Sequence, residues 1–165
     1  MRYILNSWLL IIFLLSIFAI TNALIAEFIF DLAPCKMCLK QRYAYYAIIL
    51  IVILFYIFKK TNNLWLFILN EFSIIYGLFY SIWHIGIEQK IIAGPLSCSG
   101  ILLKTDSITN LKKQINDQAI VSCADVSWTI LGISAASING MLLILILVLN
   151  TTYIYQRYYG HKKID

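Results

Sequence analysis

The stretch of sequence that decides the fold runs from Pro34 to Phe58 and reads PCKMCLKQRYAYYAIILIVILFYIF. It opens with Cys35 and Cys38, separated by two residues, and continues as an apolar run from about Leu39. The run is close to the ~20 residues that an α-helix needs to cross ~30 Å of hydrocarbon. The stretch therefore predicts a membrane-spanning helix that carries a cysteine pair at its N-terminal end.

Three further apolar runs accompany this one, and the four cover approximately residues 4–25, 39–58, 64–83 and 128–149. Only helices and closed barrels satisfy their backbone hydrogen bonds in lipid, and these runs lack the alternation of barrel strands. Of the 165 residues 61% are hydrophobic and 13% charged, whereas a soluble domain has about 25% charged residues. We predict an all-α membrane protein: one domain, residues 1–165, built as a four-transmembrane-helix bundle.

The first run has an alternative interpretation as a cleaved signal peptide, because Arg2 precedes it. The apolar region of a signal peptide is about 7–15 residues long, and this run is longer. Thr21-Asn22-Ala23 is also a poor cleavage site. We therefore favour a retained membrane helix.

The orientation follows from the positions of charges and cysteines. An even number of crossings places both termini on one side, together with the short turn at residues 59–63. Six basic residues fall on that side and seven on the other, but the segments with the termini are shorter, so charge density favours them as cytoplasmic. All four cysteines fall on the opposite side, where disulfides are permitted if it is the periplasm.

The longest polar stretch, approximately residues 84–127, contains Cys98 and Cys123. Thr105-Asp106-Ser107 offers N-cap oxygens, and Ile108, Leu111 and Ile115 then follow at i, i+3 and i+7. This pattern predicts a short amphipathic helix, either on the membrane surface or packed on the rest of the loop. We expect this periplasmic loop to move its two cysteines relative to the bundle.

The Cys35–Cys38 pair has the features of a redox-active dithiol. Pro34 keeps the helix from starting earlier, so Cys38 falls near the first turn, where the helix dipole favours a thiolate. Arg42 is four residues further along the same face. The alternatives are a structural disulfide and a zinc site of four cysteines. The wide separation of Cys98 and Cys123 disfavours zinc, and we predict no metal.

Two further polar residues point to a lipid-soluble electron acceptor. Arg42 lies at membrane depth, where a charge is costly and usually functional, and it can donate to a carbonyl oxygen of such an acceptor. Snorkelling of its side chain to the interface is the alternative. His84 ends the third run at the same face and can serve the same acceptor, or be an interfacial histidine. The basic residues form no stripe, which excludes nucleic acid and suits anionic membrane lipid.

Taken together, the motifs resemble a known family. Pro34-Cys35-x-x-Cys38-x-x-Gln41-Arg42 is similar to the signature of DsbB, the disulfide bond formation protein of bacterial inner membranes. Three further motifs are similar to those of the proteobacterial branch of this family. They are His84-x-Gly86-x-Glu88, Gly94-Pro95-x-x-Cys98-x-Gly100, and Cys123-x-Asp125-x-x-Trp128 followed by Asn139. The resemblance extends from about Asn22 to Asn150. One variation is Gln41, where many members have Glu.

The resemblance implies a protein-disulfide:quinone oxidoreductase. A reduced DsbA-like thioredoxin-fold protein would pass two electrons through the loop cysteines and the C-x-x-C pair to ubiquinone or menaquinone. By position, Cys98 would form the mixed disulfide with the DsbA-like partner, and Cys123 would exchange with Cys35. The resemblance also implies a quinone site that contains Cys38, Gln41, Arg42 and His84.

Two other functions remain as alternatives. A vitamin K epoxide reductase-like protein has similar chemistry, but that family has its C-x-x-C near a late helix, whereas here the pair opens the second. A membrane scaffold or transporter with structural disulfides would need no exchange between the pairs. Trapping of thiol intermediates separates these hypotheses, because a scaffold has one unchanging disulfide pattern.

Overall fold

The computed structural model of the chain describes residues 2–95, 98, 107–109, 122–126, 128–130 and 132–158. Its long helices are α1 (Arg2–Phe28), α2 (Lys36–Ile57), α3 (Leu64–Glu88) and α5 (Ala135–Tyr158). All four are long and apolar enough to cross a membrane. The prediction of an all-α membrane protein with four spanning helices is confirmed.

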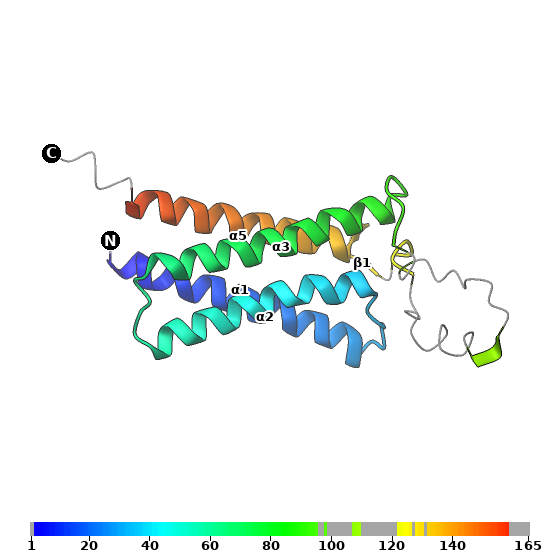
Figure 1. Cartoon of the computed structure of the whole chain (residues 1–165), viewed down its shortest axis with the longest axis horizontal. Helices are drawn as coiled ribbons and strands as arrows, with labels where there is room; N and C mark the ends of the chain where they lie inside the picture. The colour runs from blue at the N-terminus through cyan, green and yellow to red at the C-terminus, as the bar shows by residue number, and fades with distance from the viewer. Residues whose placement is uncertain are drawn as a thin grey trace.

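The helices run side by side in an elongated bundle (Figure 1). Helix α2 packs against both α1 and α3, and α3 packs against α5. The start of α1, the end of α5 and the α2–α3 turn lie at one end of the bundle, and the end of α3 and the start of α5 lie at the other (Figure 1). The cysteine-bearing end is therefore opposite the termini, as the even number of crossings predicts.

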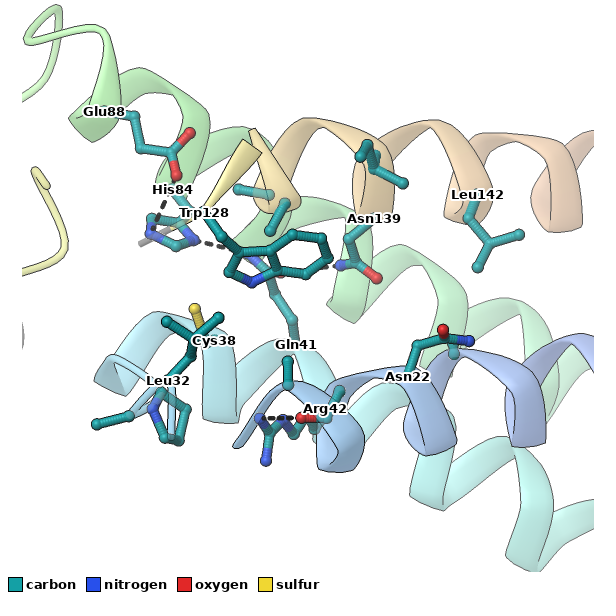
Figure 2. Close-up of a pocket in the computed structure, with 18 of the residues that line it drawn as sticks. Asn22, Leu32, Cys38, Gln41, Arg42, His84, Glu88, Trp128, Asn139 and Leu142 are labelled. Carbon is teal, nitrogen blue, oxygen red and sulfur yellow. Dashed lines mark hydrogen bonds and ion pairs between the residues drawn. The ribbon is translucent and has the colours of Figure 1, made fainter. Parts of the chain in front are cut away.

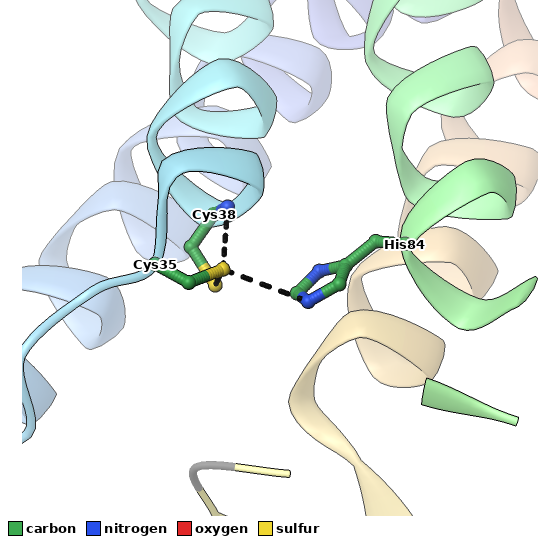
Figure 3. A group of neighbouring side chains, drawn as sticks. All are labelled: Cys35, Cys38 and His84. Carbon is green, nitrogen blue, oxygen red and sulfur yellow. Dashed lines mark hydrogen bonds between the residues drawn. The ribbon is translucent and has the colours of Figure 1, made fainter. Parts of the chain in front are cut away.

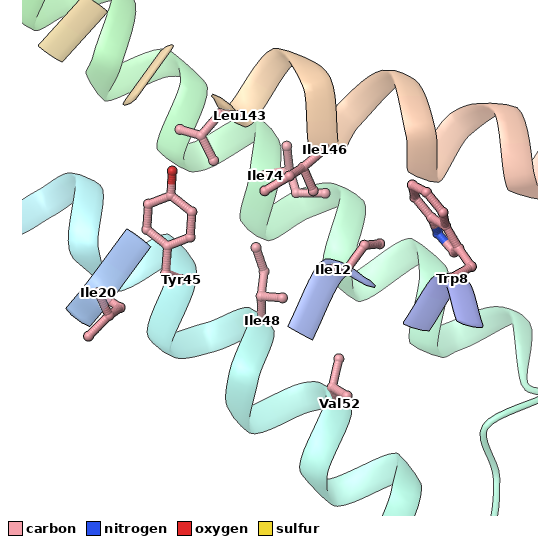
Figure 4. Close-up of a cluster of buried hydrophobic side chains, with 9 residues drawn as sticks. All are labelled: Trp8, Ile12, Ile20, Tyr45, Ile48, Val52, Ile74, Leu143 and Ile146. Carbon is pink, nitrogen blue, oxygen red and sulfur yellow. The ribbon is translucent and has the colours of Figure 1, made fainter. Parts of the chain in front are cut away.

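The bundle core is built from aliphatic and aromatic side chains of all four helices (Figure 4). Ile12, Ile48, Ile74 and Leu143 are almost completely buried in it. Helices α2 and α3 come close at Gly77, where a Cβ atom would lie only 2.6 Å from the Cβ of Ala44. Close approach through small residues is typical of membrane helices, which gain stability from backbone packing rather than from the hydrophobic effect.

The fourth helix begins later than the sequence predicted, at Ala135 instead of near Trp128. The intervening residues form a short antiparallel hairpin of β1 (Thr129–Ile130) and β2 (Ile133–Ser134). Gly132 occupies a φ of +81° in its turn, a conformation that glycine adopts without strain. In the sequence, the apolar residues of this hairpin are continuous with the apolar run of the membrane helix. The start of the helix was therefore predicted too early.

The third helix extends to Glu88, beyond the predicted end at Trp83. His84 therefore lies within α3 and not at the start of the loop, so the helix backbone fixes its position. The amphipathic helix predicted around Ile108, Leu111 and Ile115 falls almost entirely outside the described residues, and it remains a prediction.

Candidate functional site

The N-terminus of α2 positions the C-x-x-C pair. Cys35 is the N-cap residue, in an extended conformation, and its Sγ accepts a hydrogen bond of 3.2 Å from the backbone N–H of Cys38. Cys38 lies in the first helical turn, as predicted from Pro34. Both cysteines are free thiols, and their Sγ atoms are 3.0 Å apart. The pair is thus described in its dithiol form, with the sulfurs close enough to share a proton.

The two loop cysteines are joined to each other and lie against this dithiol. Cys98 and Cys123 form a disulfide, and both are buried, with exposed fractions of 2% and 0%. They belong to one buried cluster with Cys35, Met37 and Ile87. The structure therefore brings together the two cysteine pairs that the sequence separates by some 60 residues or more, which is the arrangement that exchange between them requires.

His84 on α3 contacts the C-x-x-C pair directly (Figure 3). Its Nε2 atom is 3.6 Å from the Sγ of Cys35 and 3.8 Å from the Oε1 of Glu88. Its Nδ1 atom is 3.2 Å from the Nε2 of Gln41. His84 is thus held between a sulfur and an amide, and it bridges α2 and α3 at the level of the cysteines.

The surroundings of Cys35 favour its thiolate. The hydrogen bond from the Cys38 thiol, followed by the interaction with His84, outweighs burial and lowers the pKa of Cys35 from 9.0 to about 4. Either sulfur can donate in a contact between two thiols. We assign the proton to Cys38, because the Cys38 N–H and the His84 ring also converge on Cys35. Cys35 is therefore the nucleophilic sulfur of the dithiol at neutral pH.

A cavity of about 290 Å³ lies beside the dithiol and is lined by residues of all four helices (Figure 2). Small apolar residues of α1 and α5 form much of its wall. Its polar lining includes Cys38, Gln41, Arg42 and His84, the four residues predicted to contact a cofactor. Trp128 and Asn139 line the side formed by the hairpin and α5. Such a mostly apolar cavity with a few convergent polar groups is typical of a small-molecule site.

Arg42 is engaged by α1, which the sequence analysis did not anticipate. Its Nη1 atom pairs with the carboxylate of Glu27, and its Nη2 atom donates to the backbone carbonyl of Ala23 at 3.2 Å. The Arg42 side chain is 12% exposed, so its charge is largely buried against the bundle. The sequence feature that could have indicated this pair is Glu27, a carboxylate at the end of the first apolar run.

Comparison with known proteins agrees with this geometry. The sequence profile of the family described as "Disulfide bond formation protein DsbB" matches residues 5–153, nearly the whole chain. The chain belongs to the DsbB family. The uncharacterized protein RP370 of Rickettsia prowazekii (strain Madrid E) is similar to it, with 32% identity over 141 residues, which cover 84% of this chain and 81% of that protein.

Membership of the DsbB family gives the site its chemistry. The protein is a multi-pass membrane protein with a disulfide oxidoreductase role in disulfide bond formation. The two adjacent cysteine pairs are the groups in the described part of the chain that suit this role. The sulfur and nitrogen atoms of Cys35, Cys38 and His84 also lie within 4.8 Å of one another, a set that zinc accepts. Our prediction of no metal remains untested.

Proposed function

We propose that this DsbB-family protein re-oxidises a DsbA-type thioredoxin-fold oxidase, using a membrane quinone as the electron acceptor. The observation that carries the proposal is the continuity of three parts: the buried Cys98–Cys123 disulfide, the Cys35–Cys38 dithiol and the cavity that Cys38 lines. A scaffold with structural disulfides has no need of a free dithiol beside a disulfide. Electrons can pass through these parts without a large rearrangement of the bundle.

The proposed exchange starts with both pairs oxidised. A thiolate of the reduced partner attacks Cys98, which breaks the Cys98–Cys123 bond and releases Cys123 as a thiolate. Cys123 attacks Cys35, which breaks the Cys35–Cys38 bond and leaves Cys38 reduced. The second thiol of the partner then displaces Cys98, and Cys98 displaces Cys35 from Cys123.

This sequence of exchanges balances in electrons and protons. The partner ends as a disulfide, the Cys98–Cys123 disulfide is restored, and Cys35 and Cys38 hold the two electrons as a dithiol. The described structure has this bond pattern, with Cys98 bonded to Cys123 and the other two cysteines free. In the proposed cycle, this bond pattern is the form that precedes electron transfer out of the C-x-x-C pair.

The residues around the cavity fit a quinone. When bound, a quinone supplies an acceptor for two electrons and two protons. The small apolar residues of the wall suit its ring, and Cys38 presents a sulfur to the same space. Arg42 has five N–H groups, so its contacts with Glu27 and Ala23 leave donors for a carbonyl oxygen. We therefore assign Arg42 to hold a quinone oxygen.

The redox potentials support a membrane acceptor. DsbA has a potential of about −120 mV, and a glutathione-like acceptor at about −220 mV would make its re-oxidation unfavourable by roughly 4–5 kcal/mol. An acceptor of higher potential is needed, and a quinone dissolved in the bilayer meets this requirement. It also accounts for the placement of the reaction in a membrane bundle.

We place the cysteine end of the bundle in the periplasm of a bacterial inner membrane and the termini in the cytoplasm. Disulfides persist in the periplasm and are rare in the cytosol. The turn with Lys59 and Lys60 lies at the end with the termini, as positive charge favours for the cytoplasmic side. Accessibility of Lys59→Cys, tested in a Cys-free background from each side of the membrane, checks this orientation.

Turnover of the purified protein tests the function. The protein in lipid nanodiscs is mixed anaerobically with a reduced DsbA-type partner and with ubiquinone or menaquinone, and both partner oxidation and quinone reduction are followed. We expect Cys98→Ser and Cys123→Ser to abolish partner oxidation. Both variants should still reduce quinone when dithiothreitol reduces Cys35 and Cys38 directly. Normal partner oxidation in either variant would overturn the proposed relay.

A further inference from the structure

A chain of hydrogen bonds connects the C-x-x-C pair to the middle of the bundle. Gln41 on α2 contacts His84 on α3 at 3.2 Å, and its Oε1 accepts a bond of 2.9 Å from the Nδ2 of Asn139 on α5. The Oδ1 of Asn139 accepts a bond of 2.5 Å from the hydroxyl of Tyr45 on α2. The chain therefore runs Tyr45–Asn139–Gln41–His84–Cys35 and joins three helices.

One contact fixes the direction of the whole chain. The Nε2 of Gln41 also donates, at 3.4 Å, to the backbone carbonyl of Tyr80, which can only accept. The amide nitrogen of Gln41 therefore faces α3 and its oxygen faces Asn139. Asn139 must then donate to Gln41, which leaves its oxygen for the Tyr45 hydroxyl. Each amide has one orientation that satisfies both of its neighbours.

The same direction determines the protonation of the His84 ring. Because the Gln41 amide nitrogen donates, the His84 Nδ1 must accept, and a neutral imidazole then carries its proton on Nε2. The Nε2 atom faces two acceptors, the Cys35 sulfur at 3.6 Å and the Glu88 carboxylate at 3.8 Å. His84 also interacts with the backbone of Cys123. The donor and the acceptors thus lie on the correct sides of the ring for this tautomer.

We propose that Gln41, Asn139 and Tyr45 are positioning residues that hold His84 as the Nε2–H tautomer, with this N–H directed at the Cys35 sulfur. The opposite tautomer would turn a lone pair toward the Cys35 thiolate and repel it. Gln41 thereby acts through His84, in addition to lining the cavity. The inference rests on the proposed function only in giving Cys35 a redox role, because the tautomer itself can be measured without quinone or partner.

Several charged groups surround Cys35 and enter any measurement of its titration. Helix α2 contributes Cys38 and Arg42, and Arg42 is paired with Glu27 of α1. Helix α3 contributes His84 and Glu88. The loop contributes the Cys98–Cys123 disulfide, which does not titrate. Gln41→Leu, Asn139→Leu and Tyr45→Phe alter none of the titrating groups, and all are compared in the same background without the loop cysteines, so a difference between them in the titration of Cys35 reports on the His84 tautomer.

Nitrogen NMR of the histidine rings tests the tautomer directly. The chain has two histidines, so His161→Gln with ¹⁵N-histidine labelling leaves the signals of His84 alone. In the reduced protein at neutral pH, we expect Nδ1 to resonate as an unprotonated nitrogen and Nε2 as a protonated one. Gln41→Leu should give a mixture of tautomers. A protonated Nδ1 in the parent protein, with or without a proton on Nε2, would overturn the proposal.

The pH profile of the Cys35 thiolate provides the second readout, followed by its ultraviolet absorbance in a background with Cys98→Ala and Cys123→Ala. Gln41→Leu removes the contact with His84 and should raise the midpoint by about one pH unit, since hydrogen bonds to charged groups are among the stronger ones. Asn139→Leu should have a smaller effect and Tyr45→Phe the smallest, because each is one link further from His84. A merely structural role predicts no such gradient.

Asn150→Leu is the matched control for Asn139→Leu. Asn150 lies on the same helix, is fully buried, and likewise donates to a neighbouring helix, here to the carbonyl of Phe67 on α3 at 3.3 Å. It lies 11 residues, or about 16 Å along the helix, from Asn139. We expect Asn150→Leu to lower thermal stability without moving the Cys35 midpoint. Equal shifts in the two variants, or no shift in Tyr45→Phe, Asn139→Leu and Gln41→Leu, would refute the positioning role.

Discussion

The carboxylate of Glu27 on α1 pairs with the guanidinium of Arg42 on α2, one helical turn beyond Cys38. This pair joins two helices at the wall of the cavity. It also neutralises the Arg42 charge inside the bundle, where an uncompensated charge would be costly. Arg42 is therefore held in place before any ligand binds, which is the preorganisation that a carbonyl-binding donor needs.

We expect Arg42→Ala to impair use of the quinone selectively. A hydrogen bond from a charged donor contributes about 1.5–3 kcal/mol, so the KM for quinone should rise roughly 10- to 100-fold. Thiol–disulfide exchange with the partner should be little changed, because it takes place at the loop cysteines. Steady-state kinetics with each substrate varied in turn measure the two effects separately.

Arg157→Ala is a suitable control for Arg42→Ala. Arg157 lies at the other end of the bundle, where it contacts Asn62 and the hydroxyl of Tyr153. Its loss should leave the KM for quinone unchanged. An unchanged KM in Arg42→Ala as well would remove Arg42 from the quinone site.

The effects of substituting Glu27 and Arg42 on the free energy of unfolding should be coupled. Glu27→Ala leaves Arg42 as a poorly compensated charge, but the Glu27 side chain is 26% exposed, so water can partly replace it. We expect a loss of about 1–3 kcal/mol, below the cost for a fully buried pair. The double variant Glu27→Ala/Arg42→Ala should be more stable than the sum of the single losses predicts. Thermal unfolding in detergent measures this cycle, and strict additivity would mean that the pair contributes nothing.

Much of the fold follows from local features of the sequence. Four apolar runs of spanning length predict the bundle, and Pro34 predicts the start of α2 near Cys35. The hairpin before α5 was missed, because Ile130 and Ile133 continue the apolar run and only Gly132 signals the turn. Sequence periodicity cannot separate a short apolar hairpin from the first turns of a membrane helix.

The site was predictable in composition but not in its contacts. The cysteines, Arg42 and His84 stand out because polar groups are rare in such a chain. The contacts of Arg42 with Glu27, and of Gln41 with Asn139, join residues 15 and 98 positions apart. Such pairs depend on how the helices are rotated and packed, and one sequence does not contain this information.

The Cys35 thiolate should make the reduced protein sensitive to acid. Its pKa is about 4 when folded and near 9.0 when unperturbed, so folding favours the thiolate. The resulting stability is fully present above pH 9.0 and is lost as the pH falls through about 4. The oxidised protein lacks this thiolate. We therefore expect the difference in unfolding temperature between the reduced and oxidised forms to shift in favour of the reduced form as pH rises from 4 to 9.

Substitution of the neighbours of Cys35 should weaken this dependence. Cys38→Ala removes the largest cause of the lowered pKa, and His84→Leu removes the next favourable one. The midpoint of the thiolate absorbance should rise in both variants, and more in Cys38→Ala. A midpoint that stays near 4 in both variants would show that other groups stabilise the thiolate.

The close approach of α2 and α3 should depend on the absence of a side chain at position 77. In Gly77→Ala the new Cβ would lie 2.6 Å from the Cβ of Ala44 and 3.1 Å from the Cδ1 of Leu143. Neither Cβ can move without its backbone, so the two helices must separate. We expect a loss of about 1–3 kcal/mol, typical of overpacking, and a lower thermal midpoint in detergent.

The compensating variant Ala44→Gly distinguishes this steric effect from a change in helix propensity. Alanine is the better helix former, so propensity alone predicts that Gly77→Ala stabilises α3 and that Ala44→Gly destabilises α2. If the contact between the helices dominates, Ala44→Gly should recover most of the stability lost in Gly77→Ala. Because α2 carries the cysteine pair and α3 carries His84, separation of the helices should also lengthen the contact of Cys35 with His84. The double variant should therefore recover the low midpoint of the Cys35 thiolate together with its stability, whereas recovery of stability alone would show that the two regions are uncoupled.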